Sequence, residues 1–405
     1  MQYLYKIFRQ YDYDYFVEKY KERFHMDSTI KFNLYIKPMK QPNVFELYYV
    51  PTNDIIHKVA EIYNLSGQLN MVFSKLPPVA KRQFVIECLI EELYNTNELE
   101  GVQSTKKEIA ESIRSVRLKT KEKRRFNSMI HSYMNLLENN QSLPTSPIHI
   151  REIYDEIIEG EIAENKLPDG EIFRKESVDV YKKSGSGKVI HRGLVPEEKI
   201  KFEMKNMLDM LNHMEEVPLI IRIAVGHYFF GYIHPFYDGN GRTSRFISSL
   251  YLSKTLGEIP SLSLSRGCNT LKTKYLEAFE HTNSIMNRGE MNSFIDAFLT
   301  ILLETLKEMN GELKEKVKLM DTALEKIESD KNIPSEKHSS FMFILAQNNF
   351  FSDNDGLTVK ELSQEMGLSE ATVRKIGKEL IDRKLIKQRG IRPAFYYIDD
   401  EYFEI

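Results

Sequence analysis

The strongest hydrophobic pattern of the chain is the segment 217–233, VPLIIRIAVGHYFFGYI, which is apolar on every face. Apolar residues recur at helical spacing again from residue 246, at Phe246, Ile247, Leu250 and Tyr251. Between the two lies the polar, glycine-containing run HPFYDGNGRTSR, residues 234–245. The pattern therefore predicts a loop that joins two helices, the first of them deeply buried.

Helical periodicity covers most of the remaining chain. A helix is predicted over residues 52–75, and the next begins at Pro77 and Pro78 and ends in TNELEG, residues 96–101. Further helices are predicted over residues 104–160, 197–214, 269–281 and 290–305, followed by a charged helix to about residue 327. The chain is therefore expected to be mainly α-helical.

Strand patterns are confined to short runs. Aromatic and β-branched residues at 32–36 and 44–50 predict a pair of strands around a turn. The runs SVDVYKK and KVIHRGL, joined by SGSG at 184–187, predict a hairpin within residues 165–195. His191 lies in the second run and is assigned to the hairpin, not to catalysis.

Residues 338–405 have the pattern of a separate domain. Two helices flank Gly367, Leu368 and Ser369, and two strand-like runs flank Gly390, which is typical of a winged helix-turn-helix. In that fold Ser369 caps the recognition helix, whose outward residues are Thr372, Lys375 and Lys378. A local excess of basic residues is compatible with DNA binding through 338–400, but a protein and a second copy of the chain remain alternative partners.

Composition narrows the class of protein. The 405 residues carry a formal net charge of -3, which gives no global attraction to nucleic acid or to an anionic membrane. Only Cys88 and Cys268 are present, so a disulfide framework is not expected. Arg222 and His227 within the apolar segment favour a protein core over a membrane span. A soluble, cytoplasmic protein is therefore expected.

The run 234–245 has the composition of a phosphate site. Gly239 and Gly241 add little bulk, so backbone N–H groups can approach a ligand closely. The helix that follows begins with N–H groups that lack internal partners, which favours an anion. Arg242 and Arg245 lie three residues apart on this helix, and two guanidinium groups fit a polyphosphate better than a single carboxylate.

Two more residues of the run add chemistry. Asp238 is the hard oxygen ligand that Mg²⁺ prefers, and His234 is the group of the run that can take up a proton near neutral pH. Together with the phosphate site they describe phosphate transfer. The alternatives are a solvated arginine face and a core histidine. His227 is interpreted as a core histidine, because no acidic third ligand lies near it and His234.

The run HPFYDGNGRTSR resembles the signature of the Fic family, His-x-Phe-x-Asp/Glu-Gly-Asn-Gly-Arg-x-x-Arg, and departs from it nowhere. The resemblance implies a Fic-type helical core with a β-hairpin flap over the site. Most Fic proteins are AMP transferases (AMPylation), which move AMP from ATP to a hydroxyl side chain of a target protein. The resemblance therefore implies a nucleotidyltransferase with Mg²⁺ as cofactor and ATP as substrate.

Carried over by position, the resemblance gives each residue of the run a role. His234 becomes the base that deprotonates a Ser, Thr or Tyr hydroxyl, Phe236 the anchor of the loop, and Asp238 the Mg²⁺ ligand. The phosphates would be held by Gly239, Asn240, Gly241, Arg242 and Arg245. Tyr275 occupies a place similar to that of the Fic tyrosine beside the adenine, with a packing role as the equal alternative.

An upstream segment resembles the inhibitory motif of many Fic proteins, Ser/Thr-x-x-x-Glu-Gly/Asn. Thr96, Glu100 and Gly101 match it at the end of an apolar helix. In that family the glutamate pairs with the second arginine of the signature, here Arg245, and excludes a productive γ phosphate. An autoinhibited protein adenylyltransferase is therefore the leading interpretation, with a target protein or the chain itself as acceptor.

These patterns divide the chain into an N-terminal lobe (1–75), a Fic core (76–305), a helical connector (306–337) and a winged helix-turn-helix domain (338–405). Within the core lie the inhibitory helix (about 78–101) and the flap (about 171–195). Two rival functions remain. One is a Fic enzyme that uses another nucleotide or transfers another phosphate-containing group. The other is a DNA-binding regulator whose Fic core senses nucleotide.

Overall fold

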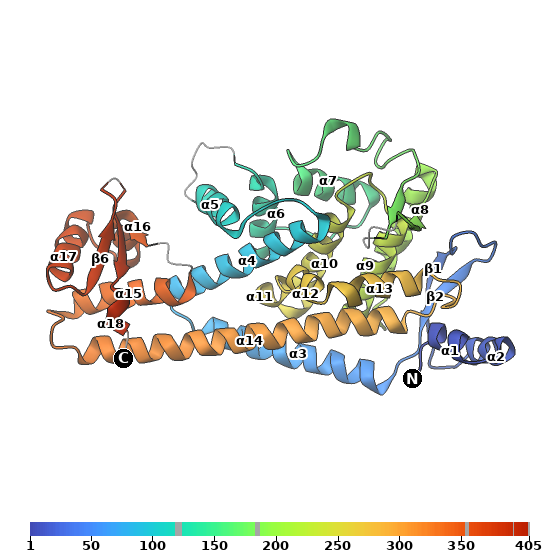
Figure 1. The fold of residues 1–405 in the computed structure, drawn as a ribbon, viewed down its shortest axis with the longest axis horizontal. Coiled ribbons are helices and arrows are strands. Elements are labelled where there is room, and N and C mark those ends of the chain that lie inside the picture. Colours follow the sequence, from blue (N-terminus) through green and yellow to red (C-terminus); the bar gives the residue numbers. More distant parts are fainter. Residues whose placement is uncertain (118–123, 183–186, 353–355, 392, 404–405) are drawn as a thin grey trace. The chain divides into compact units, whose positions relative to one another are not determined.

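The computed structural model describes residues 1–117, 124–182, 187–352, 356–391 and 393–403, and it is mainly helical with small antiparallel sheets (Figure 1). This confirms the predicted fold class. The chain forms two compact units. The first contains Met1–Gly67 and Leu89–Lys307, and the second contains Gln68–Cys88 and Glu308–Ile405.

The first unit begins with two helices, α1 (Leu4–Gln10) and α2 (Tyr13–Phe24), and a predicted strand pair, β1 (Ile30–Ile36) and β2 (Phe45–Tyr49). The buried carboxylate of Glu290 joins these helices to the rest of the unit. It accepts hydrogen bonds from the Leu4 N–H at 3.0 Å and from Nη1 of Arg23 at 2.6 Å. A buried ion pair with an extra backbone donor fixes the N-terminal segment in one position.

The helices α9 (Leu219–Ile233) and α10 (Asn240–Leu256) form the centre of the first unit. α9 packs against α10 and α8 (Glu197–His213), while α6 (Asn127–Leu137) and α7 (Pro147–Ile158) pack against α10. Nearly every residue of α9 is buried. A helix that is apolar all round must lie inside the protein, and the sequence pattern predicted this correctly.

The predicted hairpin is present as the antiparallel strands β3 (Asp179–Tyr181) and β4 (Val189–Arg192). Of its predicted turn, 184–187, only Gly187 lies within the described residues. The other elements of the first unit are α5 (Lys106–Arg117), η1 (Glu164–Lys166), α11 (Glu258–Ser261), α12 (Leu264–Thr270) and α13 (Lys272–Thr282).

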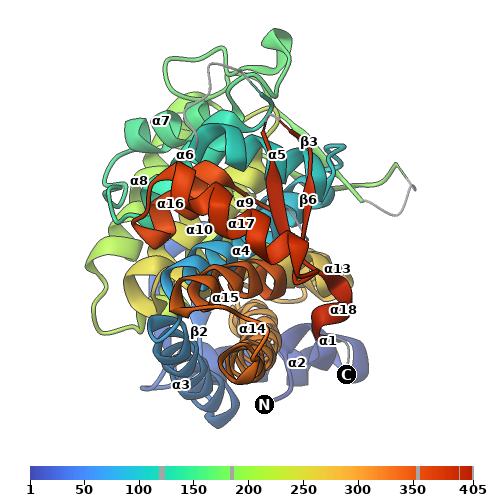
Figure 2. The same cartoon turned by 90° about the vertical axis from the view of Figure 1, so that its left-hand side faces the viewer.

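The second unit has its own hydrophobic core, which includes Phe341, Leu362, Val373 and Ile386. Its elements, several of them drawn in red in Figure 2, are α15 (Glu336–Phe351), β5 (Leu357–Thr358), α16 (Val359–Met366), α17 (Glu370–Asp382), β6 (Ile386–Arg389), β7 (Phe395–Ile398) and α18 (Asp400–Phe403). The strands pair in the order β5-β7-β6. The Ser369 side chain accepts the Thr372 N–H at 3.2 Å, which is the predicted cap of α17. The winged-helix assignment stays a prediction.

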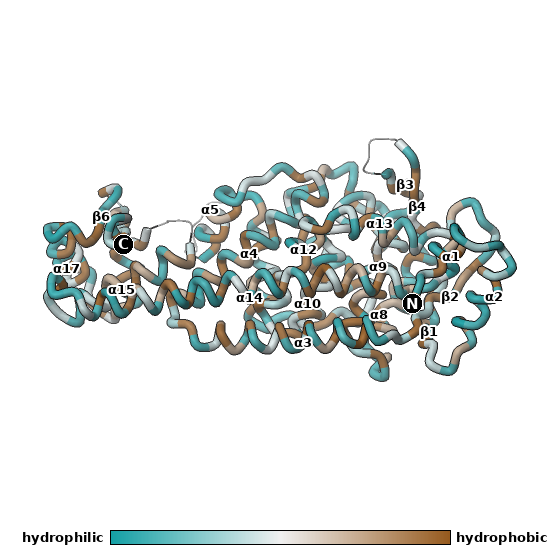
Figure 3. The backbone as a smooth tube through the Cα atoms, turned by 60° about the horizontal axis from the view of Figure 1, so that its bottom comes forward, coloured by the Kyte–Doolittle hydropathy of each residue, from teal (hydrophilic) through white to brown (hydrophobic). Residues whose placement is uncertain are grey.

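Helices α3 (Asn53–Ser74), α4 (Pro78–Glu100) and α14 (Asn292–Ser329) have residues in both units. The closing helix and the connector, which the sequence predicted as successive elements, are one continuous helix, α14. Apolar residues recur along it, as the brown segments in Figure 3 show, and Leu306, Leu313 and Met320 are buried. Nothing in this pattern stops the helix at residue 305. Along the described part of the chain, no helix combines the length and apolar content that crossing a membrane requires.

Candidate active site

The loop between α9 and α10 turns through two left-handed residues. His234 ends α9 with a φ of 50°, and Gly239 precedes α10 with a φ of 77°. A Cβ atom at Gly239 would lie 2.9 Å from Cγ2 of Ile158, so glycine is needed there for space as well as for conformation. A histidine in this conformation carries strain, which is common at functional sites.

Phe236 and Asn240 hold the loop in place. Phe236 is fully buried, and its ring lies nearly parallel to that of Tyr154, with the ring centres 3.6 Å apart. The Asn240 side chain accepts the Phe236 N–H at 3.0 Å and donates to the Phe236 carbonyl oxygen at 2.8 Å. Both amide atoms of Asn240 bond to the backbone of Phe236, so this side chain fixes the shape of the loop.

The start of α10 has the properties of an anion site. Its N-cap is Gly239, which supplies no side-chain acceptor, so the first N–H groups of the helix keep their hydrogen-bonding capacity. Arg242 is only 2 % exposed, and its Nε and Nη1 atoms have no hydrogen-bond partner among the described residues. Burial lowers the pKa of Arg242. The carboxylates of Glu100, Asp238 and Glu161 act on this guanidinium group from nearby, and its unused donors can still bind a further anionic ligand.

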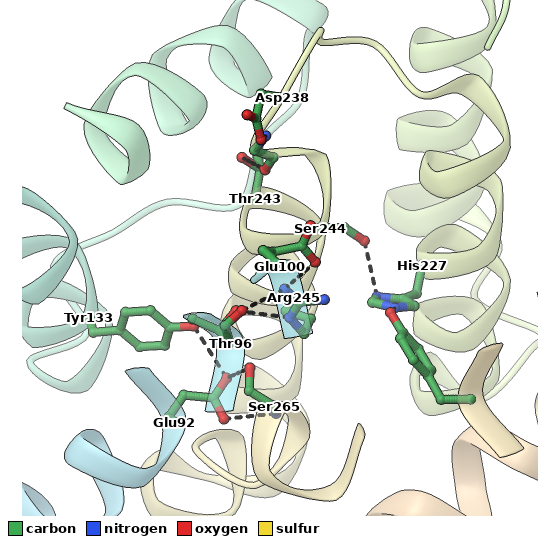
Figure 4. A network of polar contacts seen from close by, with 12 residues as sticks. Glu92, Thr96, Glu100, Tyr133, His227, Asp238, Thr243, Ser244, Arg245 and Ser265 are labelled. Atoms are coloured by element: carbon green, nitrogen blue, oxygen red, sulfur yellow. Dashed lines mark hydrogen bonds and ion pairs between the residues drawn. The ribbon is translucent and has the colours of Figure 1, made fainter. Parts of the chain in front are cut away.

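Arg245, one turn further along α10, already has anionic and polar partners (Figure 4). Its Nε donates to Oγ1 of Thr96 at 2.8 Å, and its Nη2 donates to Oε1 of Glu100 at 2.8 Å. Burial lowers the pKa of Arg245, but Glu100, Tyr275 and Cys268 together outweigh it and raise the pKa of the guanidinium. The structure therefore brings Glu100 onto Arg245, as the resemblance implied, with Thr96 as an additional contact, and Gly101 follows with a φ of 74°.

Glu100 also lies against the backbone of the glycine loop. Its Oε1 atom is 2.0 Å from the position that a Cβ on Gly241 would occupy. Gly241 therefore leaves room for the carboxylate at the start of α10. The same carboxylate contacts the part of the helix where a phosphate would be expected.

His234 is held by a residue that the sequence analysis did not select. Arg174 is completely buried, and its Nε donates to the His234 carbonyl oxygen at 2.9 Å. Its Nη2 has no hydrogen-bond partner among the described residues and lies 2.2 Å from where a Cβ on Gly193 would be. The available signal was weak: Arg174 directly follows the apolar pair Ile172 and Phe173.

The His234 ring is neutral at physiological pH. Burial lowers its pKa to about 3, and the nearby His191 and Arg174 act in the same direction, while Glu100 opposes them. A neutral imidazole has a free nitrogen lone pair. The ring can therefore accept a proton from a hydroxyl group that is placed beside it.

Asp238 already has a cation beside it. Its Oδ1 accepts the Gly239 N–H at 2.7 Å, and its Oδ2 lies 3.2 Å from Nζ of Lys166. The ammonium group of Lys166 shows that a cation fits beside Oδ2. Within the described residues, no three His, Cys, Asp or Glu side chains form a metal cluster. Mg²⁺ at Asp238 would therefore need most of its ligands from phosphate and water, which is common for this ion.

Comparison with known proteins agrees with this geometry. Residues 144–252 match the model of the Fic/DOC family, and this range contains the whole run from His234 to Arg245. This part of the chain is a Fic domain. Fic domains are known for transferring nucleotide-derived groups to proteins. The matched range begins after Thr96 and Glu100, so their place in the site rests on the contacts with Arg245.

Solved structures of Fic proteins are similar to this chain. A Fic family protein from Desulfovibrio desulfuricans G20 has a TM-score of 0.54 and 17% identity, over 87% of this chain and 98% of that chain. A Fic domain containing signaling protein from Bacteroides thetaiotaomicron VPI-5482 has a TM-score of 0.43 and 18% identity, over 63% of this chain and 97% of that chain. Fic-1 from C. elegans has a TM-score of 0.43 and 18% identity, over 64% of this chain and 74% of that chain. At these identities, the first likeness shows the fold alone.

A further carboxylate that the sequence analysis missed, Glu92, joins α4 to α6 and α12. Glu92 is completely buried and accepts the Ser265 N–H at 2.8 Å and the Tyr133 hydroxyl at 3.2 Å (Figure 4). Burial raises the pKa of Glu92. Glu92, Thr96 and Glu100 follow at four-residue intervals, so a polar stripe on an apolar helix was the signal.

His227 of α9 and Tyr275 of α13 lie in the core of the first unit. The Nε2 of His227 is 2.7 Å from the Tyr275 hydroxyl, and its Nδ1 is 2.9 Å from Oγ of Ser248. His227 is thus the hydrogen-bonded core histidine that the sequence predicted. Tyr275 is 7% exposed and its hydroxyl contacts this histidine, which favours its packing role. Its place beside an adenine stays a prediction.

Proposed function

We propose that this protein is an autoinhibited, Mg²⁺-dependent protein adenylyltransferase that moves AMP from ATP to a Ser, Thr or Tyr hydroxyl. The observation that supports it best is the start of α10, where buried Arg242 donors without a partner lie beside unused backbone N–H groups. Donors on two arginines and a helix end suit a chain of phosphates better than one carboxylate. ATP and Mg²⁺ are abundant in the cytoplasm, where we expect the protein to act.

In the proposed reaction, His234 accepts the proton of the target hydroxyl. The hydroxyl oxygen then bonds to the α phosphorus, and the bond from that phosphorus to the pyrophosphate oxygen breaks. Arg242, Arg245 and the start of α10 stabilise the charge of the departing pyrophosphate. Mg²⁺ held by Asp238 would neutralise phosphate charge, and Lys166 would then leave this carboxylate.

Autoinhibition follows from the pairing of Arg245. Its guanidinium cannot bind Glu100 and a γ phosphate with the same N–H groups at once. A partly buried pair of this kind contributes a few kcal/mol at most, which corresponds to about a ten- to several-hundredfold change in occupancy. Glu100 would therefore lower the population of productive ATP without preventing nucleotide binding.

The test compares Glu100→Gly with Glu98→Gly, which places the same flexible residue near the end of the same helix. Each protein is incubated with labelled ATP and Mg²⁺, and labelling of the chain and of added cell lysate is measured. Labelling by Glu100→Gly should rise about ten- to several-hundredfold, while Glu98→Gly should stay near the wild type. Equal labelling by all three proteins would contradict the inhibitory role of Glu100.

The transferred group separates this proposal from its nearest rival. A Fic enzyme that moves phosphate, UMP or phosphocholine would use the same base and loop. Mass spectrometry of Glu100→Gly, after exposure to a nucleotide mixture in lysate, reads both the added mass and the modified residue. An added mass equal to that of an AMP group supports the proposal. Any other added mass would contradict AMP transfer and favour the rival reaction.

A further inference from the structure

The segment 169–178, directly before β3, is bonded to the loop that carries His234. Arg174 of this segment contacts the loop through its backbone and through its side chain. Its N–H donates to the Pro235 carbonyl oxygen at 3.3 Å, and its Nε donates to the His234 carbonyl oxygen at 2.9 Å. The segment and the loop both belong to the first unit. Arg174 thus fixes the backbone at the residue proposed as the base.

The side-chain bond of Arg174 is made where the loop backbone needs support. His234 has a φ of 50° and a ψ of 63°, a left-handed conformation that residues with a side chain seldom adopt. Its N–H already donates to the Phe230 carbonyl oxygen at 2.9 Å. The bond from Arg174 fixes the peptide group on the other side of His234. Because these two peptide groups set the direction of the Cα–Cβ bond, Arg174 controls where the imidazole begins.

Arg174 is an unfavourable residue for a purely structural role. It is completely buried, its Nη1 donates to the Glu176 carbonyl oxygen, and its Nη2 has no hydrogen-bond partner among the described residues. Burial lowers the pKa of Arg174 to about 10, so the surroundings disfavour its charge. A buried cation with an unused donor lowers stability, and such groups are concentrated at functional sites.

Gly193, directly after β4, leaves the space that Arg174 occupies. A Cβ at residue 193 would lie 2.2 Å from Nη2 of Arg174 and 3.1 Å from Cβ of His234. The φ of Gly193 is outside the left-handed region, so this glycine is needed for space and not for conformation. An alanine at residue 193 should therefore push the guanidinium group away from the His234 carbonyl oxygen.

We infer that Arg174 is a positioning residue for His234: its guanidinium group holds the His234 carbonyl oxygen, so that the imidazole keeps the orientation in which it accepts a proton. The inference rests on the proposed function, since it concerns the same base. In that function the phosphates are held at α10 and Mg²⁺ at Asp238, away from this bond. Loss of the bond should therefore slow AMP transfer without weakening ATP binding.

The kinetic test uses Arg174→Lys in the Glu100→Gly background, because an ammonium group keeps the charge but cannot make the bonds of the guanidinium fork. Initial rates of labelling at several ATP concentrations give the maximal rate and the KM for ATP. The maximal rate should fall about tenfold or more, because a misplaced base reacts slowly, while the KM should stay within about twofold. Arg151→Lys is the matched control. Nη1 of Arg151 donates to the Ile172 carbonyl oxygen of the same segment at 2.9 Å, and this variant should keep the parent rate.

A second variant leaves Arg174 in place and keeps the test decisive if Arg174→Lys does not fold. Gly193→Ala should lower the maximal rate in the same direction, again with an unchanged KM for ATP. Its control is Gly67→Ala, since a Cβ at Gly67 would have nothing within 4 Å. The control should transfer AMP like the parent protein.

Hydrogen exchange followed by mass spectrometry reports on the loop without any chemistry. Peptides that cover residues 230–237 should exchange about fivefold faster in Arg174→Lys and in Gly193→Ala than in the two control proteins. Peptides from the middle of α10 should exchange at the parent rate in all four variants.

The inference requires both a lower maximal rate at constant KM and faster exchange of the loop. If the parent protein transfers AMP, the absence of either change in Arg174→Lys and Gly193→Ala would overturn it, as would an equal loss of rate in Arg151→Lys. If the Glu100→Gly parent transfers no AMP, the proposed function fails. The exchange of residues 230–237 then decides by itself whether Arg174 holds the loop of His234.

Discussion

Two helix starts of this protein carry basic residues in opposite environments. At the start of α10, Gly239 gives no side-chain cap, and Arg242 and Arg245 are 2% and 1% exposed. In α17 the Ser369 side chain caps the helix start, and Lys375 and Lys378, further along the helix, are exposed. Both helices carry basic residues, but only the arginines of α10 are buried away from water.

This difference in burial distinguishes a candidate ligand site from an ordinary solvated surface. A buried guanidinium loses its hydration and must find an anion or acceptors inside the protein. At α10 this need is met for Arg245 by Thr96 and Glu100, while Arg242 keeps unused donors. Exposed lysines on α17 are solvated and require no ligand. The buried arginines of α10 thus favour an anionic partner, whereas the exposed lysines of α17 need none.

The largest expected effect concerns the base beside the buried site. In a Glu100→Gly background, His234→Ala should lower AMP transfer by about a hundredfold or more, because the ring removes the hydroxyl proton. ATP affinity, measured by calorimetry, should stay within about twofold, since the phosphates are held by other residues. The exposed His213 gives the control, His213→Ala, which should keep full activity. Full activity of His234→Ala would refute the assignment.

A second substitution tests whether the buried donors of α10 serve a ligand. Arg242→Ala should weaken ATP binding by about ten- to a hundredfold, because it removes charge-assisted hydrogen bonds to phosphate. Arg242→Lys should lose part of the ATP affinity, since an ammonium group cannot make the two parallel hydrogen bonds of a guanidinium group. Arg374→Ala, at an exposed arginine of α17, should leave ATP binding unchanged. An equal loss of ATP affinity in Arg242→Ala and Arg374→Ala would show that the buried arginine of α10 has no special role in binding ATP.

The buried histidines extend the contrast to stability. Burial lowers the pKa of His227 and His234 to about 3 and that of His191 to about 4. The unfolded chain therefore takes up these protons first. The free energy of unfolding should fall as the pH drops from about 6.5 toward 4. Each histidine lowers it by up to about 1.4 kcal/mol per pH unit in this window. Above about pH 6.5 the histidines add no pH dependence.

Urea unfolding at several pH values between about 7 and 4 measures this slope. His227→Gln should reduce the slope by the contribution of one histidine. The His57 side chain is 80% exposed, so His57→Gln should leave the slope as it is. An identical slope in the His227→Gln protein would show that the histidine is not buried in its neutral form.

The smallest effect is expected at the exposed helix start. If α17 contacts DNA through its phosphates, Lys375→Ala/Lys378→Ala should weaken binding a few-fold at physiological salt. The slope of log affinity against log salt should also fall by about two. DNA binding with an unchanged salt slope would exclude these lysines from the contact. ATP binding should be the same in both proteins.

The sequence determined the elements and the chemistry of the run 234–245. A helix that is apolar all round has to be buried, so α9 and the loop that follows it could be placed from periodicity alone. The four-residue step from Thr96 to Glu100, followed directly by Gly101, resembles the inhibitory motif of the family, and this spacing places both side chains on one face of a helix. The continuity of α14 across residue 305 was not predicted, because the sequence analysis divided one amphipathic pattern into two helices there.

Only the tertiary structure decided which distant residues share an environment. Arg174 reaches the His234 carbonyl oxygen across 60 positions of sequence, and Glu92 meets Ser265 across 173. Burial is also a property of the packed chain. Sequence spacing therefore could not distinguish the buried arginines of α10 from the exposed lysines of α17. Contacts between elements depend on how all helices pack together, and that packing has no local signal in the sequence.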